Sequence, residues 1–144
     1  MELIIFVGVQ ASGKSTWYRN HLAATHVHVS KDLMPNARDK DAKQLQMIAA
    51  ALREGKSVAV DNTNPTPAVR APLIALGRAA GARVVGYLFE TVVKEAVVRN
   101  RAREGRARVP DVAIYVTSKK LVPPSLEEGF DEVHVIAPFA NAAL

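Results

Sequence analysis

The chain has 144 residues, of which 49% are hydrophobic and 23% charged, and its formal net charge is +5. This length and composition predict one globular domain spanning residues 1–144 and exclude a disordered, collagen-like or coiled-coil protein. Cysteine is absent, which excludes disulfides, cysteine-based zinc sites and thiol nucleophiles.

Strands and helices alternate along the sequence, which predicts an α/β fold with a parallel sheet. Short apolar runs that are typical of buried strands occupy residues 3–7, 27–29, 58–60, 83–89 and 132–136. The first run, Leu3–Val7, is continuously apolar, as expected of a central strand that is covered on both faces.

The stretches between these strands have the spacing of amphipathic helices. One helix is predicted to bury the face that carries Leu45, Ile48 and Leu52. Another is predicted to bury Val69, Leu73, Leu76 and Ala80. Thr66 and Pro67 are typical of a helix start, but Pro72 removes a backbone hydrogen bond, so this helix is expected to begin late or to be kinked. Thr91 is expected to cap a helix over 92–101.

Residues 8–15 match the pattern G-x-x-x-x-G-K-[ST] at every fixed position, directly after the first strand and at the start of a helix near Lys14. Gly8 and Gly13 permit unusual backbone angles and leave N–H groups free to face phosphate oxygens. Lys14 is expected to reach the β- and γ-phosphates of ATP or another nucleoside triphosphate, and the Ser15 hydroxyl to ligate Mg²⁺. The predicted nucleotide-binding residues are Gly8, Gln10, Ala11, Ser12, Gly13, Lys14, Ser15 and Thr16.

Two further strands each deliver a carboxylate to the carboxyl edge of the sheet, where open α/β sheets bind ligands. Asp61 ends the strand over 58–60, and we expect it to contact Mg²⁺ or the substrate. Asp32 follows the strand over 27–29 and is placed to accept the proton of an attacking hydroxyl. The residues alone leave alternatives open, since Asp61 could cap a turn and Asp32 could be the N-cap of the next segment.

Five arginines fall within the ten residues from Arg99 to Arg108. Spacings of four and three predict that Arg99, Arg103 and Arg106 share one helical face. A solvated basic surface is the ordinary interpretation of such a run. In a phosphate-transfer protein, the same run is typical of a lid, here about 99–112, whose arginines neutralise charge on the γ-phosphate.

The remaining features of the sequence are less specific. The four histidines, His21, His26, His28 and His134, have no metal-ligand spacing, and we expect them to lie in the core or on the surface. The chain begins without the basic start of a signal peptide, and no apolar run reaches the roughly 18 residues of a membrane span, which predicts a cytoplasmic protein with no membrane partner. Its net positive charge fits a polyanionic ligand, although many basic proteins bind no nucleic acid.

Taken together, these segments resemble the 5′-hydroxyl polynucleotide kinase family, especially the kinase module of polynucleotide kinase–phosphatases. The resemblance runs in order through Gly13–Trp17, Val29–Asp32, Val60–Pro65, Arg70, Arg99–Arg103, Val109–Pro110 and Pro124–Phe130. Many nucleotide-binding proteins share the first segment, whereas the Asp-Asn-Thr-Asn-Pro and Glu-Gly-Phe segments are much more specific.

The resemblance implies a P-loop kinase fold, in which helices flank a five-stranded parallel sheet of order 2-3-1-4-5 and an arginine-rich lid is present. It also implies transfer of the ATP γ-phosphate to the 5′-hydroxyl end of DNA or RNA. Asp32 matches the general base, Arg103 the lid arginine on the transferring phosphate, and Arg99 a lid arginine near the nucleotide. Asp61, with Asn62 beside it, matches a carboxylate at the magnesium hydration shell or the substrate end.

The sequence departs from the family at three points. Pro35 replaces an arginine that contacts the substrate in phage-type members, and Arg38 is a candidate to replace it. Ser30-Lys31 stand where many members have Asn-Arg. Phosphatase and ligase motifs are absent, which predicts a stand-alone kinase or one excised from a larger polypeptide. The alternatives are a kinase for a small-molecule hydroxyl and an ATP-gated nucleic-acid-binding module.

Overall fold

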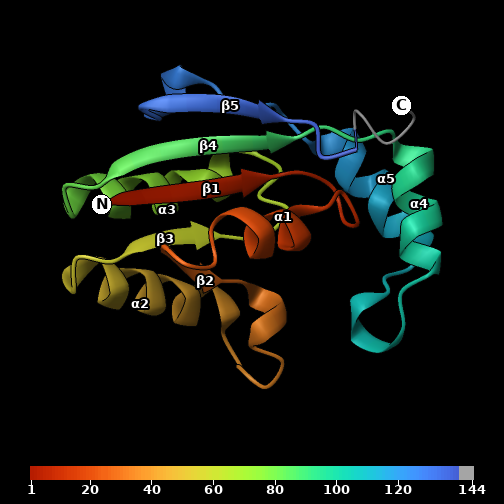
Figure 1. Ribbon diagram of the computed structural model, residues 1–144, viewed down its shortest axis with the longest axis horizontal. Coiled ribbons are helices and arrows are strands. Elements are labelled where there is room, and N and C mark those ends of the chain that lie inside the picture. The colour runs from red at the N-terminus through yellow and green to blue at the C-terminus, as the bar shows by residue number, and fades with distance from the viewer. Residues whose placement is uncertain (140–144) are drawn as a thin grey trace.

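Five parallel strands form the sheet at the centre of the computed structural model, which describes residues 1–139 (Figure 1). The strands are β1 (Glu2–Val7), β2 (His26–Val29), β3 (Ser57–Val60), β4 (Arg83–Phe89) and β5 (Glu132–Ile136). They lie in the order β2-β3-β1-β4-β5, and each neighbouring pair is parallel. The predicted fold and strand order are therefore confirmed, while residues 140–144 of the predicted domain lie outside the described residues.

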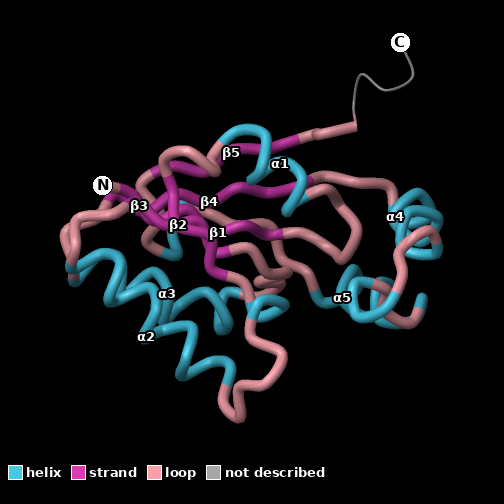
Figure 2. Tube along the Cα trace, turned by 60° about the horizontal axis from the view of Figure 1, so that its bottom comes forward, coloured by secondary structure: helices cyan, strands magenta, loops and turns pink. Residues whose placement is uncertain are grey.

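The central strand β1 is buried because helices cover both faces of the sheet. Leu3 and Ile5 pack into a cluster with side chains of the second and third helices, while Ile4 and Phe6 pack on the other face with the first helix. Figure 2 shows α2 (Lys40–Arg53) and α3 (Pro67–Ala79) on one side of the sheet and α1 (Lys14–His21) on the other. Two covered faces explain why the sequence of β1 is continuously apolar instead of alternating.

The helices are α1 (Lys14–His21), α2 (Lys40–Arg53), α3 (Pro67–Ala79), α4 (Val93–Arg101) and α5 (Asp111–Lys120). Helix α1 begins at Lys14, as the glycine-rich pattern predicts. Helix α2 buries Ile48 and Leu52 and packs Leu45 against the core, which confirms its predicted face. No helix among residues 1–139 is both long enough and apolar enough to cross a membrane.

Helix α3 begins where its capping motif predicts and continues through Pro72. The Thr66 hydroxyl accepts a hydrogen bond from the backbone N–H of Val69 at 3.3 Å, and Pro67 is the first helical residue. The expectation that Pro72 delays the helix start is wrong. Pro72 lies on the exposed side of the helix, as does Ala68, so water can satisfy the Ala68 carbonyl that loses its helical partner.

The predicted buried face of α3 is only partly correct. Val69 and Ala80 are exposed, while Leu73 and Leu76 pack against the core as predicted. The buried residues of the helix are Arg70, Leu73, Ile74 and Gly77. The buried face is rotated relative to the predicted one, because Arg70 is fully buried in place of Val69.

The predicted cap of α4 is wrong. The helix begins at Val93 after Val92, which makes no side-chain cap. The Thr91 hydroxyl instead accepts a hydrogen bond from Arg99 Nη2 at 2.5 Å. The Arg99 guanidinium, two turns into the helix, therefore binds the Thr91 hydroxyl oxygen, which is predicted to accept from the backbone N–H groups at the helix start.

Candidate active site

A pocket of about 380 Å³ opens at the carboxyl ends of the central strands. Its walls are the glycine-rich loop, the exits of β2 and β3, the connection between α4 and α5, and the end of α5. The predicted site residues that it brings together are Gln10, Ala11, Ser12, Lys14, Ser15, Asp32, Asp61, Asn62 and Arg103. Gly8, Gly13, Thr16 and Arg99 are predicted site residues that do not line it.

The glycine-rich loop has the tight backbone that its pattern predicts. Gly13 and Ala11 both have left-handed backbone angles, with φ of 92° and 60°. A Cβ atom on Gly8 would lie 2.9 Å from Ser12 Oγ and 3.1 Å from Phe89 Cβ, so only glycine fits there without a shift. Gly8 and Gly13 therefore shape the loop backbone, although neither of them lines the pocket.

The other loop side chains take different positions. Gln10 Nε2 donates to Thr117 Oγ1 at 3.1 Å, which joins the loop to α5. Thr16 is exposed, and its hydroxyl accepts a hydrogen bond from Arg19 at 3.2 Å. Among the loop residues that are predicted to bind the nucleotide, Thr16 is therefore the most exposed to solvent.

Lys14 is folded across the inside of the loop. Its Nζ atom donates to the carbonyl oxygens of Gly8 and Val9 at 3.0 and 2.6 Å. The pKa of Lys14 is lowered to about 8, mainly by burial and also by the charge of Arg103, against the opposing charges of Asp61 and Asp32. The lysine is thus short of counter-charge, which favours binding of an anion such as a phosphate.

Asp61 lies at the floor of the pocket and is tied by two donors. Ser15 Oγ donates to Asp61 Oδ2 at 2.6 Å, and His28 Nε2 lies 2.8 Å from the same oxygen. Burial by itself raises the pKa of Asp61, but the hydrogen bonds from His28 and Ser15 and the charge of Lys14 hold this pKa below its ordinary value. Asp61 is therefore an anionic carboxylate beside a hydroxyl.

A hydroxyl and a carboxylate are the hard oxygen ligands that Mg²⁺ prefers in proteins. The contact between Ser15 and Asp61 thus fits the predicted magnesium site, which stays a prediction. The alternative interpretation of Asp61 as a turn cap is not favoured, because its recorded side-chain partners are a hydroxyl and an imidazole and not backbone N–H groups.

His28 is the residue of this site that the sequence missed. In the parallel pairing of β2 and β3, His28 lies beside Ala59, and Asp61 follows Ala59 by two residues. Side chains two apart in a strand point to the same face, so His28 and Asp61 meet above the sheet. The signal that would have found this contact is the register of β2 and β3, which periodicity alone does not supply.

Asp32 differs from Asp61 because no side chain within the described residues donates a hydrogen bond to its carboxylate. Its side chain is exposed in the pocket, and its carboxylate has no hydrogen-bond partner among residues 1–139. The alternative that Asp32 is an N-cap is wrong. Ser30 caps the short 3₁₀ turn Lys31–Leu33, and Asp39 caps α2 by accepting from the Ala42 N–H at 3.0 Å.

Asn62 holds the segment that carries Asp32. The amide oxygen of Asn62 accepts a hydrogen bond from the backbone N–H of Lys31 at 2.9 Å, and its Nδ2 donates to Gln44 Oε1 at 2.6 Å. Both polar atoms of its side chain are engaged in this way. Asn62 lines the pocket, as predicted for a substrate-binding residue, and also fixes the distance between the ends of β2 and β3.

The rest of the Asp-Asn-Thr-Asn-Pro segment connects β3 to the glycine-rich loop. The Gly8 N–H donates to the Thr63 carbonyl at 3.0 Å, and Asn64 Nδ2 donates to the Phe6 carbonyl at 2.8 Å. Arg70 Nη1 donates to the Asn64 carbonyl at 2.9 Å, and its other nitrogens pair with Glu128 at 2.8 and 3.0 Å. One buried arginine therefore links the segment that contains Asp61 to the Glu-Gly-Phe segment.

The predicted arrangement of the arginines on one helical face is wrong. Helix α4 ends at Arg101, before Arg103 and Arg106. The buried side chain of Asn100 causes the chain to turn back, since it donates to the Val109 carbonyl at 2.7 Å and accepts from the Val109 N–H at 3.0 Å. Figure 1 shows this connection folded back between α4 and α5.

The three arginines have separate positions. Arg103 and Arg106 line the pocket. Arg99 lies against the glycine-rich loop, where its Nε donates to the Ala11 carbonyl at 2.7 Å, and its guanidinium lies 4.0 Å from the Phe139 ring centroid. The interpretation of residues 99–112 as a lid stays a prediction.

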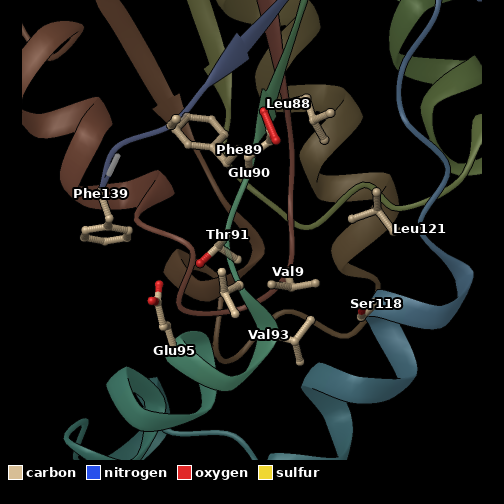
Figure 3. Close-up of a pocket in the computed structure, with 12 residues that line it drawn as sticks. Val9, Leu88, Phe89, Glu90, Thr91, Val93, Glu95, Ser118, Leu121 and Phe139 are labelled. Atoms are coloured by element: carbon tan, nitrogen blue, oxygen red, sulfur yellow. The ribbon is translucent and has the colours of Figure 1, made fainter. Parts of the chain in front are cut away.

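A second cavity, of about 600 Å³, lies between the end of β4, the start of α4 and the end of α5 (Figure 3). Val9, Leu88, Val93 and Leu121 make its lining mainly apolar. None of the predicted site residues lines this cavity. Although it is larger, it lacks the lysine, hydroxyl and carboxylates of the first pocket, so we assign the chemistry to the smaller pocket.

The fold and the glycine-rich loop define a P-loop protein of the kinase type, a phosphotransferase fold. Residues 3–121, most of the chain, match the AAA domain family, and the chain belongs to this family. The family resemblance predicted from the motifs is thus confirmed, and the curated relatives agree with it.

The curated relatives that match are longer proteins. A protein of Acanthamoeba polyphaga mimivirus, named as a bifunctional polynucleotide phosphatase/kinase, is 31% identical over 99% of this chain and 35% of its own length. The bifunctional polynucleotide phosphatase/kinase of Schizosaccharomyces pombe is 26% identical over 96% of this chain and 34% of its own length. The chain thus spans about a third of the length of these relatives.

Solved structures with several activities share the fold. Kti12 of Chaetomium thermophilum, solved in complex with ADP-AlF3, has a TM-score of 0.74 at 20% identity and covers 98% of this chain and 92% of its own. A fungal RNA kinase has a TM-score of 0.66 at 16% identity, with coverages of 100% and 79%. A gluconokinase from Sinorhizobium meliloti has a TM-score of 0.65 at 20% identity, with coverages of 96% and 85%. These likenesses show the fold alone.

Proposed function

We propose that this chain transfers the γ-phosphate of ATP to the 5′-hydroxyl end of a DNA or RNA strand. The observation that carries the proposal is the position of Asp32. Its carboxylate, unpaired among residues 1–139, lines the same pocket as Lys14, Ser15 and Arg103, so a base and a phosphate site share one space. The names of the mimivirus and fission yeast relatives favour a polynucleotide as the acceptor.

The residues of the glycine-rich loop bind the donor in this proposal. The backbone N–H groups of the loop and the ammonium of Lys14 hold the β- and γ-phosphates. Lys14 exchanges its contacts with the Gly8 and Val9 carbonyls for phosphate oxygens. Ser15 and Asp61 would hold Mg²⁺, which neutralises charge on the β- and γ-phosphate oxygens when it is bound.

Asp32 and Arg103 act on the transfer itself. Asp32 orients the acceptor hydroxyl and takes its proton, while the acceptor oxygen bonds to the γ-phosphorus and the bond from that phosphorus to the β–γ bridging oxygen breaks. Arg103 stabilises the negative charge on the equatorial oxygens of the transferring group. Exposed Asp32 is suited to this role because an acceptor can approach it from solvent.

The basic rim of the pocket favours an acceptor that carries phosphates. Lys31, Arg106 and Lys120 line the pocket from three different segments, outside the set that contacts the donor. These cations replace the arginine that Pro35 removes, and they would contact the phosphodiesters next to the reacting 5′ end. Arg38, the candidate suggested by the sequence, does not line the pocket and is not assigned this contact.

Side-by-side labelling of oligonucleotides with radioactive ATP and GTP tests the proposal. We expect label at the 5′ end of 5′-hydroxyl DNA or RNA and none on strands that already carry a 5′-phosphate. Labelling should weaken as salt rises, because phosphate contacts are screened. Tight strand binding without any labelled product would contradict transfer and favour an ATP-gated binding module.

A kinase for a small-molecule hydroxyl is the second candidate, and the fold shared with the gluconokinase favours it. The two candidates differ in whether the basic rim of Lys31, Arg106 and Lys120 contacts phosphates of the acceptor. A panel of sugars and other small alcohols, assayed with the same ATP, separates them. Exclusive labelling of a small alcohol would overturn the polynucleotide proposal.

A further inference from the structure

We propose that His28 is a positioning residue, which holds the Asp61 carboxylate in the orientation that serves the magnesium–nucleotide complex. The inference rests on the donor half of the proposed function, in which Ser15 and Asp61 handle the metal, and not on the identity of the acceptor. His28 does not line the pocket itself, so it acts through Asp61.

The contact of His28 with Asp61 follows from the strand register. His28 Nε2 lies 2.8 Å from Asp61 Oδ2, and the residues lie on neighbouring strands, with side chains on the same face of the sheet. Asp61 is 4% exposed, so its partners and not water determine its orientation. A buried carboxylate needs such donors, because an unpaired buried charge is costly.

The two donors to Asp61 use only one of its oxygens. Ser15 and His28 both contact Oδ2, and Oδ1 has no hydrogen-bond partner among residues 1–139. Because Asp61 lines the pocket, this arrangement leaves Oδ1 as the oxygen that is available to the metal or its water shell. If Ser15 is drawn toward a metal, His28 is the donor that still prevents the carboxylate from rotating.

The imidazole is itself held from its other side. The His28 ring stacks on Tyr18, with centroids 4.0 Å apart and planes 16° apart. Tyr18 is buried in α1, and its hydroxyl donates to the His26 carbonyl at 2.6 Å. Tyr18 and Ser15 both belong to α1, so one helix positions both donors to Asp61.

The role of His28 needs a donor and not a change of charge. Nε2 carries a hydrogen both in one neutral tautomer and in the cation, and either form donates to Asp61. Residues that orient the ligands of a metal typically change metal affinity or activity by about 10–100-fold when they are substituted. We therefore expect loss of the donor to be seen in metal-dependent binding.

His26 provides an internal control. It precedes His28 by two residues on the same face of β2, and its Nε2 contacts Glu2 Oε1 at 2.8 Å. Glu2 lies at the opposite end of the sheet from the pocket, since it begins β1. Replacing the His26 imidazole should therefore remove a contact of β2 and leave the hydrogen bonds of Asp61 in place.

Two substitutions separate hydrogen bonding from packing. His28→Phe keeps a ring that can stack on Tyr18 and removes the donor. His28→Gln removes the ring and keeps an amide donor near the place of Nε2. The measurement is the affinity for a fluorescent non-hydrolysable ATP analogue with Mg²⁺ and with EDTA, and the readout is the ratio of these two affinities.

We expect His28→Phe to lower the ratio by about 10-fold or more, and His28→Gln to restore most of it. His26→Phe should leave the ratio unchanged. A general loss of folding lowers both affinities and not their ratio, and melting curves identify it directly. If His28→Phe does not fold, His28→Leu replaces it as the donor-free variant.

Two results would overturn the inference. One is an unchanged ratio in His28→Phe, which means that Asp61 needs no second donor. The other is a lowered ratio in His28→Gln with a normal ratio in His28→Phe, which assigns the effect to stacking. Failure of the proposed function has a different signature, because a normal magnesium ratio with no labelled oligonucleotide leaves the His28 inference standing.

Discussion

The two sides of the pocket are built differently. On the β3 side, which we call the rigid side, Asp61, Asn62 and Asn64 each make side-chain hydrogen bonds, and the buried ion pair of Arg70 and Glu128 supports the segment. The free side consists of Asp32 and Arg103: within the described residues, the Asp32 carboxylate is unpaired and the Arg103 side chain makes only a 3.3 Å contact to the Ala107 carbonyl of its own loop.

This difference suggests a division of work within one pocket. In the proposed function, the rigid side would meet a ligand whose geometry is always the same, the triphosphate with its metal. Asp32 and Arg103 would meet the acceptor and the transferring phosphate, whose charge changes during the reaction. Substitutions on the free side should therefore change the rate with little effect on folding, and those on the rigid side should change stability first.

The largest effect is expected from Arg103→Ala on the free side. Loss of an arginine that stabilises the transferring phosphoryl group should lower kcat by about 10³–10⁵-fold. Steady-state labelling of an oligonucleotide measures this effect. Arg101→Ala is the control, because Arg101 pairs with Asp111 and does not line the pocket. A loss confined to nucleic-acid affinity would make Arg103 a residue that only attracts the strand.

Asp32→Asn should be the next largest effect. Removal of a general base typically costs about 10²–10⁴-fold in rate. ATP affinity and the melting temperature should be unchanged, because the Asp32 carboxylate makes no hydrogen bond within the described part of the chain. The measurement is single-turnover labelling together with nucleotide binding. Near-normal rates in this variant would show that the base is elsewhere.

On the rigid side, Arg70→Met should destabilise the fold by about 3–5 kcal/mol, because it leaves Glu128 without the partner of a buried ion pair. Denaturant unfolding measures this change. Arg78→Met, on the same helix, should cost no more than about 1 kcal/mol, since Arg78 and its partner Asp131 are exposed. Equal losses in both variants would contradict the assigned role of the Arg70 pair.

The smallest effect is a pH dependence of nucleotide binding. The pKa of Lys14 is about 8, so the free protein loses this positive charge as pH rises through 8, while a bound phosphate favours the charged form. Affinity for ADP should therefore fall above pH 8, by at most about 10-fold per pH unit. Lys14→Arg keeps its charge throughout this range, so any binding it retains should not show the fall. An unchanged wild-type affinity between pH 7 and 9.5 would contradict the low pKa.

Features that depend on neighbouring residues were well predicted from the sequence. The strands were found because covered strands are continuously apolar, as in Leu3–Val7. The glycine-rich loop was found because Gly8 and Gly13 meet backbone requirements that the pattern states directly. Lys14, Ser15, Asp32 and Asp61 then follow from the rule that parallel strands present their carboxyl ends at one edge.

The errors concern residues whose partners are distant in the sequence. The burial of Arg70 is not predicted, because its neutralising partner Glu128 is 58 residues away. Thr91 is predicted to cap the helix, but its hydroxyl binds Arg99 instead, and Arg99 lies in a later turn of the same helix. His28 was assigned to the core or surface, because only the pairing of β2 with β3 places it on Asp61.

The side chain of Asn100 has a consequence for how this part of the chain evolves. Its two hydrogen bonds to the backbone of Val109 hold the two ends of the loop together, so the residues between Asn100 and Val109 form a loop with fixed ends. We expect insertions, deletions or exchanges in this loop, outside Arg103, to leave α4 and α5 in place. In the proposed function, a new acceptor preference could therefore arise from changes at a few loop positions, without changes in the elements that would hold the nucleotide.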